Sequence, residues 1–98
     1  MSSPPSAVLD RLYDIIQERK LGAPPGSYTA ALLAKGRTEI AKKVGEEAIE
    51  VVLASAQAKN DRVIYESADL IYHLFVLLAA HDIAPSDLYA ELERRMKP

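Results

Sequence analysis

A chain of 98 residues, 49% of them hydrophobic, has the length and composition of one small folded domain and is unlike a disordered segment. Its formal net charge of −2 provides no basic field for nucleic acid or an anionic membrane, and the lack of cysteine excludes disulfides and cysteine zinc sites. The first residues lack the regions of a signal peptide, and the longest apolar run, residues 74–80, is too short to span a membrane. We therefore expect a single cytoplasmic domain over residues 1–98, with no nucleic-acid or membrane partner.

The first part of the chain contains two helical segments separated by a break. Residues 1–5 are expected to form a mobile tail, and Ser6 can cap a first helix that ends near Lys20. Its apolar side chains follow one helical stripe, formed by Val8, Leu9, Leu12, Ile15 and Ile16. After a Gly- and Pro-rich break at residues 22–26, a short helix is expected over residues 30–35, ended by Gly36 in a left-handed cap.

Two long helices follow, and a short polar turn joins them. The first is expected over residues 38–58 and the second over residues 62–81, with a side-chain cap offered by residues 59–61. The second is apolar on nearly every side over residues 70–80, which requires a central position in the subunit or in an oligomer. A last helix is expected over residues 85–96, opened by its proline and carrying a thin apolar face.

These helical patterns are interrupted by no strand alternation, internal repeat or second domain. The fold class is therefore all-α, an antiparallel bundle of four to five helices. Short helices enclose a modest core, and the apolar helix over residues 70–80 has more apolar surface than three neighbours can cover. We therefore expect dimerisation, or a larger homo-oligomer, to complete the bundle.

Both long helices carry carboxylates that repel one another. Each helical residue turns by about 100°, so the acidic residues of each helix fall within about a quarter-turn. They are Glu46, Glu47 and Glu50 in the first long helix, and Glu66 and Asp69 in the second. Like charges at this spacing destabilise an isolated helix, which predicts a compensating cation.

The two acidic clusters are expected to meet if the long helices pack antiparallel across their turn. Glu50 lies roughly ten residues before the turn and Glu66 about six after it, which at about 1.5 Å per residue gives similar levels. Carboxylates on two rigid helices are hard oxygen ligands suited to Mg²⁺, with Mn²⁺ as a substitute, and Mg²⁺ often shares substrate phosphate oxygens. The alternative is that glutamate-rich helices are simply solvated faces. A di-iron site is disfavoured because neither helix carries a Glu-x-x-His pair.

The order of these acidic residues matches a known motif. The pattern Glu46-Glu47-x-x-Glu50 followed by Glu66-x-x-Asp69 resembles the E-E-x-x-E…E-x-x-D motif of the all-α, MazG-like nucleotide pyrophosphohydrolases. Further elements resemble, more narrowly, the phosphoribosyl-ATP pyrophosphohydrolase family: Ser27-Tyr28-Thr29, Gly36, residues 43–48 and residues 68–74. The resemblance runs from about Leu9 to Arg95. The acidic motif alone identifies the superfamily, and the Ser-Tyr-Thr and Tyr-His-Leu elements support the narrower assignment.

The resemblance implies Mg²⁺-dependent hydrolysis of phosphoribosyl-ATP to phosphoribosyl-AMP and pyrophosphate, the second step of histidine biosynthesis. It implies that the metal ligands are Glu47, Glu50, Glu66 and Asp69, and that Glu46, Glu47 and Glu50 take part in catalysis. Glu46 is either a further ligand or the base that orients the attacking water. The chain has neither the length nor the cysteines of a fused cyclohydrolase domain, so we expect the stand-alone form.

Basic residues near the acidic motif are candidates for substrate binding. Lys43 lies four residues before Glu47, so its ammonium can reach a phosphate or pair with a neighbouring glutamate. Arg37 and Lys42, with Lys35 nearby, can attract phosphates electrostatically, although each is also typical of a solvated surface.

Three residues with aromatic or hydroxyl side chains are also candidates. Tyr28 and Thr29 enter through the family resemblance alone, since an isolated tyrosine after a turn more often packs against the core. His73 shares a helix face with Glu66 and Asp69. We expect it either in the substrate-binding set or hydrogen-bonded to a metal-binding carboxylate, the other possibility being a satisfied core histidine.

Two other functions are compatible with the sequence. One is a house-cleaning MazG-like enzyme that acts on ordinary or damaged nucleoside triphosphates. The other is a non-catalytic helical dimerisation module whose acidic patches contact a basic partner. Gly45 argues against the module, because a glycine in mid-helix costs about 1 kcal/mol relative to alanine. That cost predicts close packing or substrate approach at this position.

Overall fold

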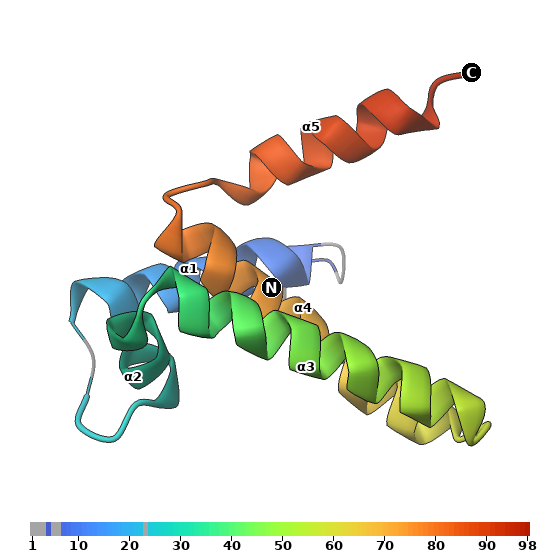
Figure 1. Cartoon of the computed structure of the whole chain (residues 1–98). Helices are drawn as coiled ribbons and strands as arrows, with labels where there is room; N and C mark the ends of the chain where they lie inside the picture. Colours follow the sequence, from blue (N-terminus) through green and yellow to red (C-terminus); the bar gives the residue numbers. More distant parts are fainter. Residues whose placement is uncertain (1–3, 5–6, 23) are drawn as a thin grey trace.

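The computed structural model describes residue 4, residues 7–22 and residues 24–98. Within this part all the regular elements are α-helices, and the all-α prediction is confirmed (Figure 1). They are α1 (Val8–Leu21), α2 (Tyr28–Lys35), α3 (Arg37–Ala56), α4 (Asn60–Ala80) and α5 (Pro85–Met96).

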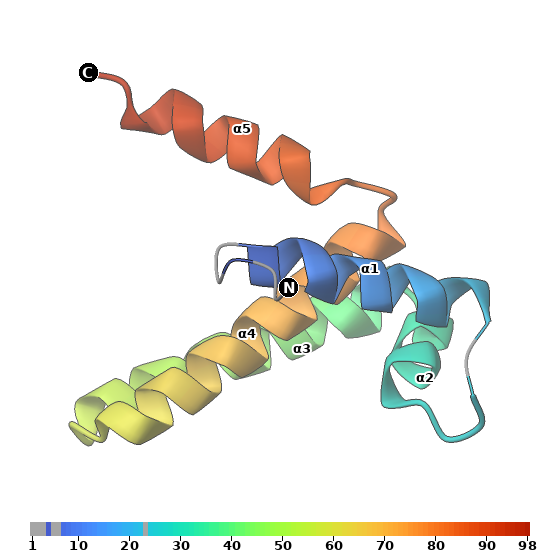
Figure 2. The same ribbon diagram turned by 180° about the vertical axis from the view of Figure 1, so that it is seen from behind.

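The helices α3 and α4 form an antiparallel hairpin, as the short turn between them predicted (Figure 1). The end of this hairpin that carries the turn extends beyond α1 and α2 in both views (Figures 1 and 2). On α3, the side chains of Ile40, Glu47 and Ala54 are buried at helical spacing. This face packs against α4 and therefore determines which α3 carboxylates lie between the two helices.

The core lies where α1, α2, the start of α3 and the C-terminal half of α4 meet. The ring of Tyr13 on α1 packs edge-on against Phe75 on α4, with 6.5 Å between the ring centroids. The other buried members of this core are Ile16, Leu32, Ile40, Val76 and Ala79. By length and composition alone α4 could cross a membrane, with a mean hydropathy of 1.5 over its most apolar window. The burial of Phe75, Val76 and Ala79 instead makes it the central helix of the bundle, as its apolar sequence predicted.

The helix α5 begins as the sequence predicted, with the buried Pro85 in its first turn. It packs against α1 and lies apart from the α3–α4 hairpin (Figure 2). The hydroxyl of Tyr89 donates a hydrogen bond to the carboxylate of Asp10 on α1, at 2.9 Å. Leu88 and Tyr89 are partly buried against the core, whereas Leu92 is 45% exposed. This helix therefore has the thin apolar contact that was expected.

Several predicted helix ends differ from the structure. The Ser27 side chain accepts a hydrogen bond from the Ala30 N–H at 3.2 Å, so α2 begins at Tyr28, two residues before the prediction. The predicted side-chain cap at residues 59–61 is wrong, because α4 begins after Lys59 without one. The predicted cap Ser6 lies outside the described residues, as does most of the predicted tail, and α1 follows Ala7 without a side-chain cap.

Other expectations about single residues are corrected as well. Gly36 has a positive φ of 93°, as predicted, but its ψ of 170° lies outside the left-handed helical region. Val8 and Ile15 are about half exposed, because α1 turns the face that contains Tyr13 and Ile16 toward the core instead. A Cβ added at Gly45 would meet no atom within 4 Å, so the close packing predicted at this glycine is absent from the described chain.

Candidate active site

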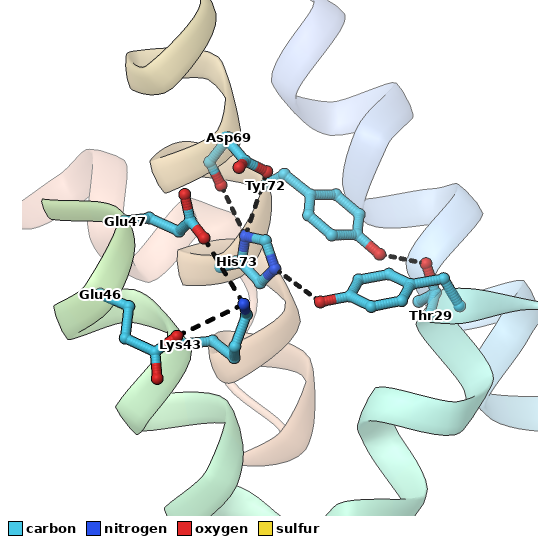
Figure 3. Close-up of polar contacts among 8 residues, drawn as sticks. Thr29, Lys43, Glu46, Glu47, Asp69, Tyr72 and His73 are labelled. Atoms are coloured by element: carbon cyan, nitrogen blue, oxygen red, sulfur yellow. Dashed lines mark hydrogen bonds and ion pairs between the residues drawn. The ribbon is translucent and has the colours of Figure 1, made fainter. Parts of the chain in front are cut away.

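Glu47 on α3 lies opposite Asp69 and His73 on α4 (Figure 3). One carboxylate oxygen from each acid and one imidazole nitrogen all lie within 4.8 Å of one another. The Glu47 residue is 8% exposed and His73 is 3% exposed, whereas the Asp69 side chain is 36% exposed, so the cluster is open to solvent on the Asp69 side. The antiparallel hairpin thus brings one carboxylate from each predicted acidic cluster to the same level.

A second pair of carboxylates lies one helical turn closer to the α3–α4 turn. Glu50 and Glu66 line one pocket of about 220 Å³, together with Leu53, Ala54, Gln57 and Arg62. Glu66 is 5% exposed and forms an ion pair with the Arg62 guanidinium at 3.5 Å. The guanidinium also lies over the Tyr65 ring, 4.8 Å from its centroid. The predicted acidic residues therefore form two successive levels between the same helices.

The remaining glutamate of the motif, Glu46, is exposed and lies beside Lys43. The Lys43 ammonium is 3.5 Å from a Glu46 carboxylate oxygen and 3.6 Å from one of Glu47 (Figure 3). Burial lowers the pKa of Lys43, but the nearby Tyr28 phenol and the two glutamates outweigh this effect and raise it. Lys43 therefore makes the local pairs that the sequence allowed, at the edge of the acidic cluster.

The Glu47 and Asp69 carboxyls face one another, with an oxygen of each within 4.8 Å of the other. Their hydrogen bond raises the pKa of Glu47, and burial and repulsion from the Asp69 charge raise it further. Lys43 and His73 act in the opposite direction without cancelling these effects. A raised pKa in one of two facing carboxyls indicates an excess of negative charge over the cations around them. A divalent cation at this position would compensate that excess, and hard carboxylate oxygens are its preferred ligands.

Four side chains connect the start of α2 to α4 beside this cluster. The Tyr28 hydroxyl is 3.0 Å from Nε2 of His73. The Thr29 hydroxyl is hydrogen-bonded to the Tyr72 hydroxyl (Figure 3). Nδ1 of His73 donates to the backbone carbonyl of Asp69 at 2.8 Å and is 3.4 Å from the Asp69 carboxylate. The expected contact between His73 and an acidic residue is thus made chiefly with that residue's backbone.

The structure does not bring all the predicted residues into the cluster. Arg37 is exposed at the first residue of α3, about 15 Å along the helix from Glu47. Lys42 is exposed as well, and its side chain leaves α3 about 140° around the axis from Glu47. Sequence reasoning missed the hydroxyl contact of Tyr72, which entered only as part of the Tyr-His-Leu element. It also missed Arg62, although an arginine four residues before Glu66 is a recognisable helical ion pair.

Comparison with known proteins gives one consistent result. A family model described as phosphoribosyl-ATP pyrophosphohydrolase matches residues 9–96. The chain is 56% identical over 92 residues to the phosphoribosyl-ATP pyrophosphatase of Sulfurisphaera tokodaii, covering 94% of this chain and 98% of that protein. It is 50% identical over 88 residues to the protein of the same name from Geobacter sulfurreducens, covering 90% of this chain and 82% of the relative. It is 49% identical over 90 residues to the phosphoribosyl-ATP pyrophosphatase of Saccharolobus islandicus, covering 92% of this chain and 96% of that protein.

Proposed function

This chain belongs to the phosphoribosyl-ATP pyrophosphohydrolase family, and we propose that its active site lies between α3 and α4. The reaction is hydrolysis of phosphoribosyl-ATP to phosphoribosyl-AMP and pyrophosphate, a step of histidine biosynthesis. Above all, the Glu47–Asp69 pair supports this location, because two facing carboxyls, one buried and with a raised pKa, form a site suited to a cation and a polyanionic substrate. We also infer a cytoplasmic enzyme that works as a homodimer.

The residues that would hold Mg²⁺, or Mn²⁺ in its place, form the two levels described above. Glu47 and Asp69 lie at one level and Glu50 and Glu66 at the other, all offering oxygen ligands. A cation bound there would neutralise the triphosphate and the charge that develops on the leaving pyrophosphate. The ion pair between Arg62 and Glu66 fits this assignment, since it partly compensates the same excess of negative charge.

The protein's own side chains would orient the other reactants. Lys43 at the edge of the cluster is placed to contact a phosphate oxygen, and Glu46 beside it is exposed to water. We assign Glu46 to orient the attacking water and accept its proton as the new oxygen–phosphorus bond forms and the phosphoanhydride bond breaks. Arg37 and Lys42, exposed on α3, would attract the substrate at longer range.

Pyrophosphate release from phosphoribosyl-ATP tests the activity, with common nucleoside triphosphates assayed beside it. We expect Mg²⁺-dependent release from phosphoribosyl-ATP and little from the others. Glu47→Gln is expected to reduce the rate at least about 100-fold, a loss typical of removing one group that stabilises transition-state charge. The control Glu39→Gln, exposed in the first turn of α3, should retain activity.

Thermal melting provides a second readout. A cation that binds only the folded protein raises the melting temperature, so Mg²⁺ or Mn²⁺ should stabilise the wild type and Glu39→Gln but not Glu47→Gln. Full activity in Glu47→Gln, with an unchanged response to the cation, would show that the site lies elsewhere. Comparable turnover of ordinary triphosphates would instead identify the house-cleaning activity, and no turnover of any nucleotide would support the dimerisation module.

A further inference from the structure

Both ring nitrogens of His73 have hydrogen-bond partners of fixed position. Nδ1 is 2.8 Å from the backbone carbonyl oxygen of Asp69, and a carbonyl oxygen can only accept. The proton of a neutral imidazole must therefore be on Nδ1. Because the residue is 3% exposed, water does not compete for this bond. The backbone of α4 thus selects one tautomer of the ring.

The tautomer determines what the other nitrogen can do. With the proton on Nδ1, Nε2 carries a lone pair, so the Tyr28 hydroxyl 3.0 Å away donates its hydrogen to it. The nitrogen nearest to the acidic cluster is Nδ1, which is 3.4 Å from the Asp69 carboxylate and carries the proton. A protonated imidazole nitrogen cannot bind a metal. The distances within the Glu47–Asp69–His73 cluster would suit a three-ligand site, but the hydrogen bonds leave only the two acids as ligands.

Two adjacent hydrogen bonds, and not one, attach the start of α2 to α4. Tyr28 bonds to His73, and the next residue, Thr29, bonds to Tyr72, so two consecutive residues on each helix are joined. The rings of Tyr72 and His73 also pack edge to face, with 4.9 Å between their centroids. Ser27 caps the same turn of α2, and its first residues are thereby fixed relative to α4.

We propose that His73 is a positioning residue and not a cation ligand: held as the Nδ1–H tautomer by the Asp69 carbonyl, it orients the Tyr28 hydroxyl and the start of α2 beside the acidic site. Since the hydroxyl hydrogen is directed to His73, the Tyr28 oxygen presents lone pairs to its other neighbours. It therefore favours an ammonium such as Lys43 over a phosphate oxygen. The catalytic consequence rests on the proposed function, whereas the tautomer does not.

Nitrogen NMR of the imidazole rings tests the tautomer directly. The chain contains two histidines, His73 and the exposed His81, so the variant His81→Gln assigns both signals. At a pH where the rings are neutral, we expect a protonated Nδ1 and an unprotonated Nε2 for His73, both with and without saturating Mg²⁺. A proton on Nε2, or loss of the Nδ1 proton when Mg²⁺ is added, would overturn the proposal, the latter by making His73 a ligand.

The variant Tyr28→Phe tests the bond to Nε2 without disturbing the core, because Tyr28 is 55% exposed. The Nε2 signal of His73 should move toward that of a nitrogen without a hydrogen-bond donor, while Nδ1 stays protonated. An unmoved Nε2 signal would show that the bond is absent in solution. We also expect the KM for phosphoribosyl-ATP to rise about tenfold with a smaller change in kcat, the lower end of the usual effect of an orienting residue.

Two substitutions of His73 distinguish positioning from mere packing. In His73→Gln the longer side chain can place an amide oxygen near the Nε2 position and so keep an acceptor for Tyr28. The side chain of His73→Asn reaches only the Nδ1 position, so it retains the bond to the Asp69 carbonyl and leaves Tyr28 without an acceptor. We expect His73→Asn to raise the KM for phosphoribosyl-ATP and His73→Gln to raise it much less. Adding Tyr28→Phe to His73→Asn should raise the KM no further.

The positioning role would be contradicted if the KM increases of Tyr28→Phe and His73→Asn were additive in the double variant. Equal KM increases in His73→Gln and His73→Asn would contradict it as well. If either His73 variant fails to fold, the NMR of the wild type and of Tyr28→Phe still tests the tautomer of His73 and its hydrogen bond to Tyr28. An absence of phosphoribosyl-ATP turnover in the wild type would overturn the proposed function alone, because the imidazole signals are measured without substrate.

Discussion

Lys20 joins the C-terminal ends of two helices through one ammonium group. Its Nζ donates a hydrogen bond to the Ala79 carbonyl at 2.8 Å, in the last turn of α4, and pairs with the Asp82 carboxylate just beyond it. The hydrogen bond from Lys20 and the attraction of its charge lower the pKa of Asp82. A lysine at the end of α1 thus adds a second hydrogen bond to a carbonyl at the end of α4 that also accepts from the Asp82 N–H.

Asp82→Asn isolates the charge of this contact, because asparagine also tolerates the positive φ of 57° found here. A carboxyl whose pKa is lowered by folding stabilises the fold above its ordinary value of 3.8, and this contribution is lost as the pH falls through the lowered value. At neutral pH and low salt we therefore expect a lower melting temperature for the variant than for the wild type. The melting temperatures of the variant and the wild type should converge as the pH is lowered into the acid range. Melting monitored by circular dichroism measures this, and a pH-independent difference would assign the effect to the backbone.

Residues of the site differ in how well the sequence could predict them. Glu47 and Asp69 lie on helices joined by a short turn, so helical spacing was enough to place them opposite one another. The bond between Tyr28 and His73 joins residues 45 positions apart, and it depends on how α2 packs against α4. No local pattern encodes that packing, and the family resemblance alone drew attention to Tyr28.

Both long helices end in the same hydrogen-bonded motif, and neither uses a glycine. At the end of α3, the Lys59 N–H donates to the Ala54 carbonyl at 3.3 Å and the Ala58 N–H donates to Ser55 at 3.0 Å. The end of α4 repeats the pattern from residues 82 and 83 to residues 79 and 78, at 3.1 and 2.9 Å. These are Schellman motifs, whose left-handed residue is usually glycine. Here it is an alanine and an aspartate, so the sequence carried no stop signal, and the predicted ends at residues 58 and 81 are two and one residues too late.

The left-handed Ala58, with φ of 55°, offers a test of this motif. A Cβ in this conformation costs about 1 kcal/mol, and glycine removes that cost while adding entropy to the unfolded chain. We expect Ala58→Gly to raise the free energy of unfolding by roughly 0.5 kcal/mol, measured from urea denaturation at constant m. The control Ala41→Gly, exposed within α3, should lower it by about 1 kcal/mol. An equal decrease in the free energy of unfolding in both variants would show that Ala58 is not strained.

Over the whole molecule, the chain is more extended than a compact domain of its length. The Cα radius of gyration is 14.7 Å, against about 13 Å for a typical compact domain of 100 residues. The end of the α3–α4 hairpin carries exposed apolar side chains: Ile49 at 60%, Val52 at 65%, Ile64 at 71% and Tyr65 at 61%. The sequence predicted an apolar surplus over residues 70–80 of α4, whereas these four exposed side chains lie closer to the turn, on both helices. Such surfaces are typical of interfaces between subunits.

If a second copy covers this surface, the wild type should have about twice the chain mass of 10.8 kDa in light scattering or sedimentation. Its melting temperature should also rise with protein concentration. A carboxylate introduced by Ile64→Asp would be buried without a partner, so we expect monomers and a lower melting temperature. The matched control Leu21→Asp alters a side chain that is 89% exposed at the far end of α1 and should remain dimeric.

The same variant relates assembly to the active site. The pocket that contains Glu50 and Glu66 lies in the half of the hairpin that carries Ile64, so an assembled partner would lie close to it. We therefore expect Ile64→Asp to lose activity together with its dimeric mass, and to regain activity as protein concentration restores the dimer. A wild type that stays at 10.8 kDa at every concentration would disprove the homodimer. A fully active monomeric Ile64→Asp would show that one chain completes the site.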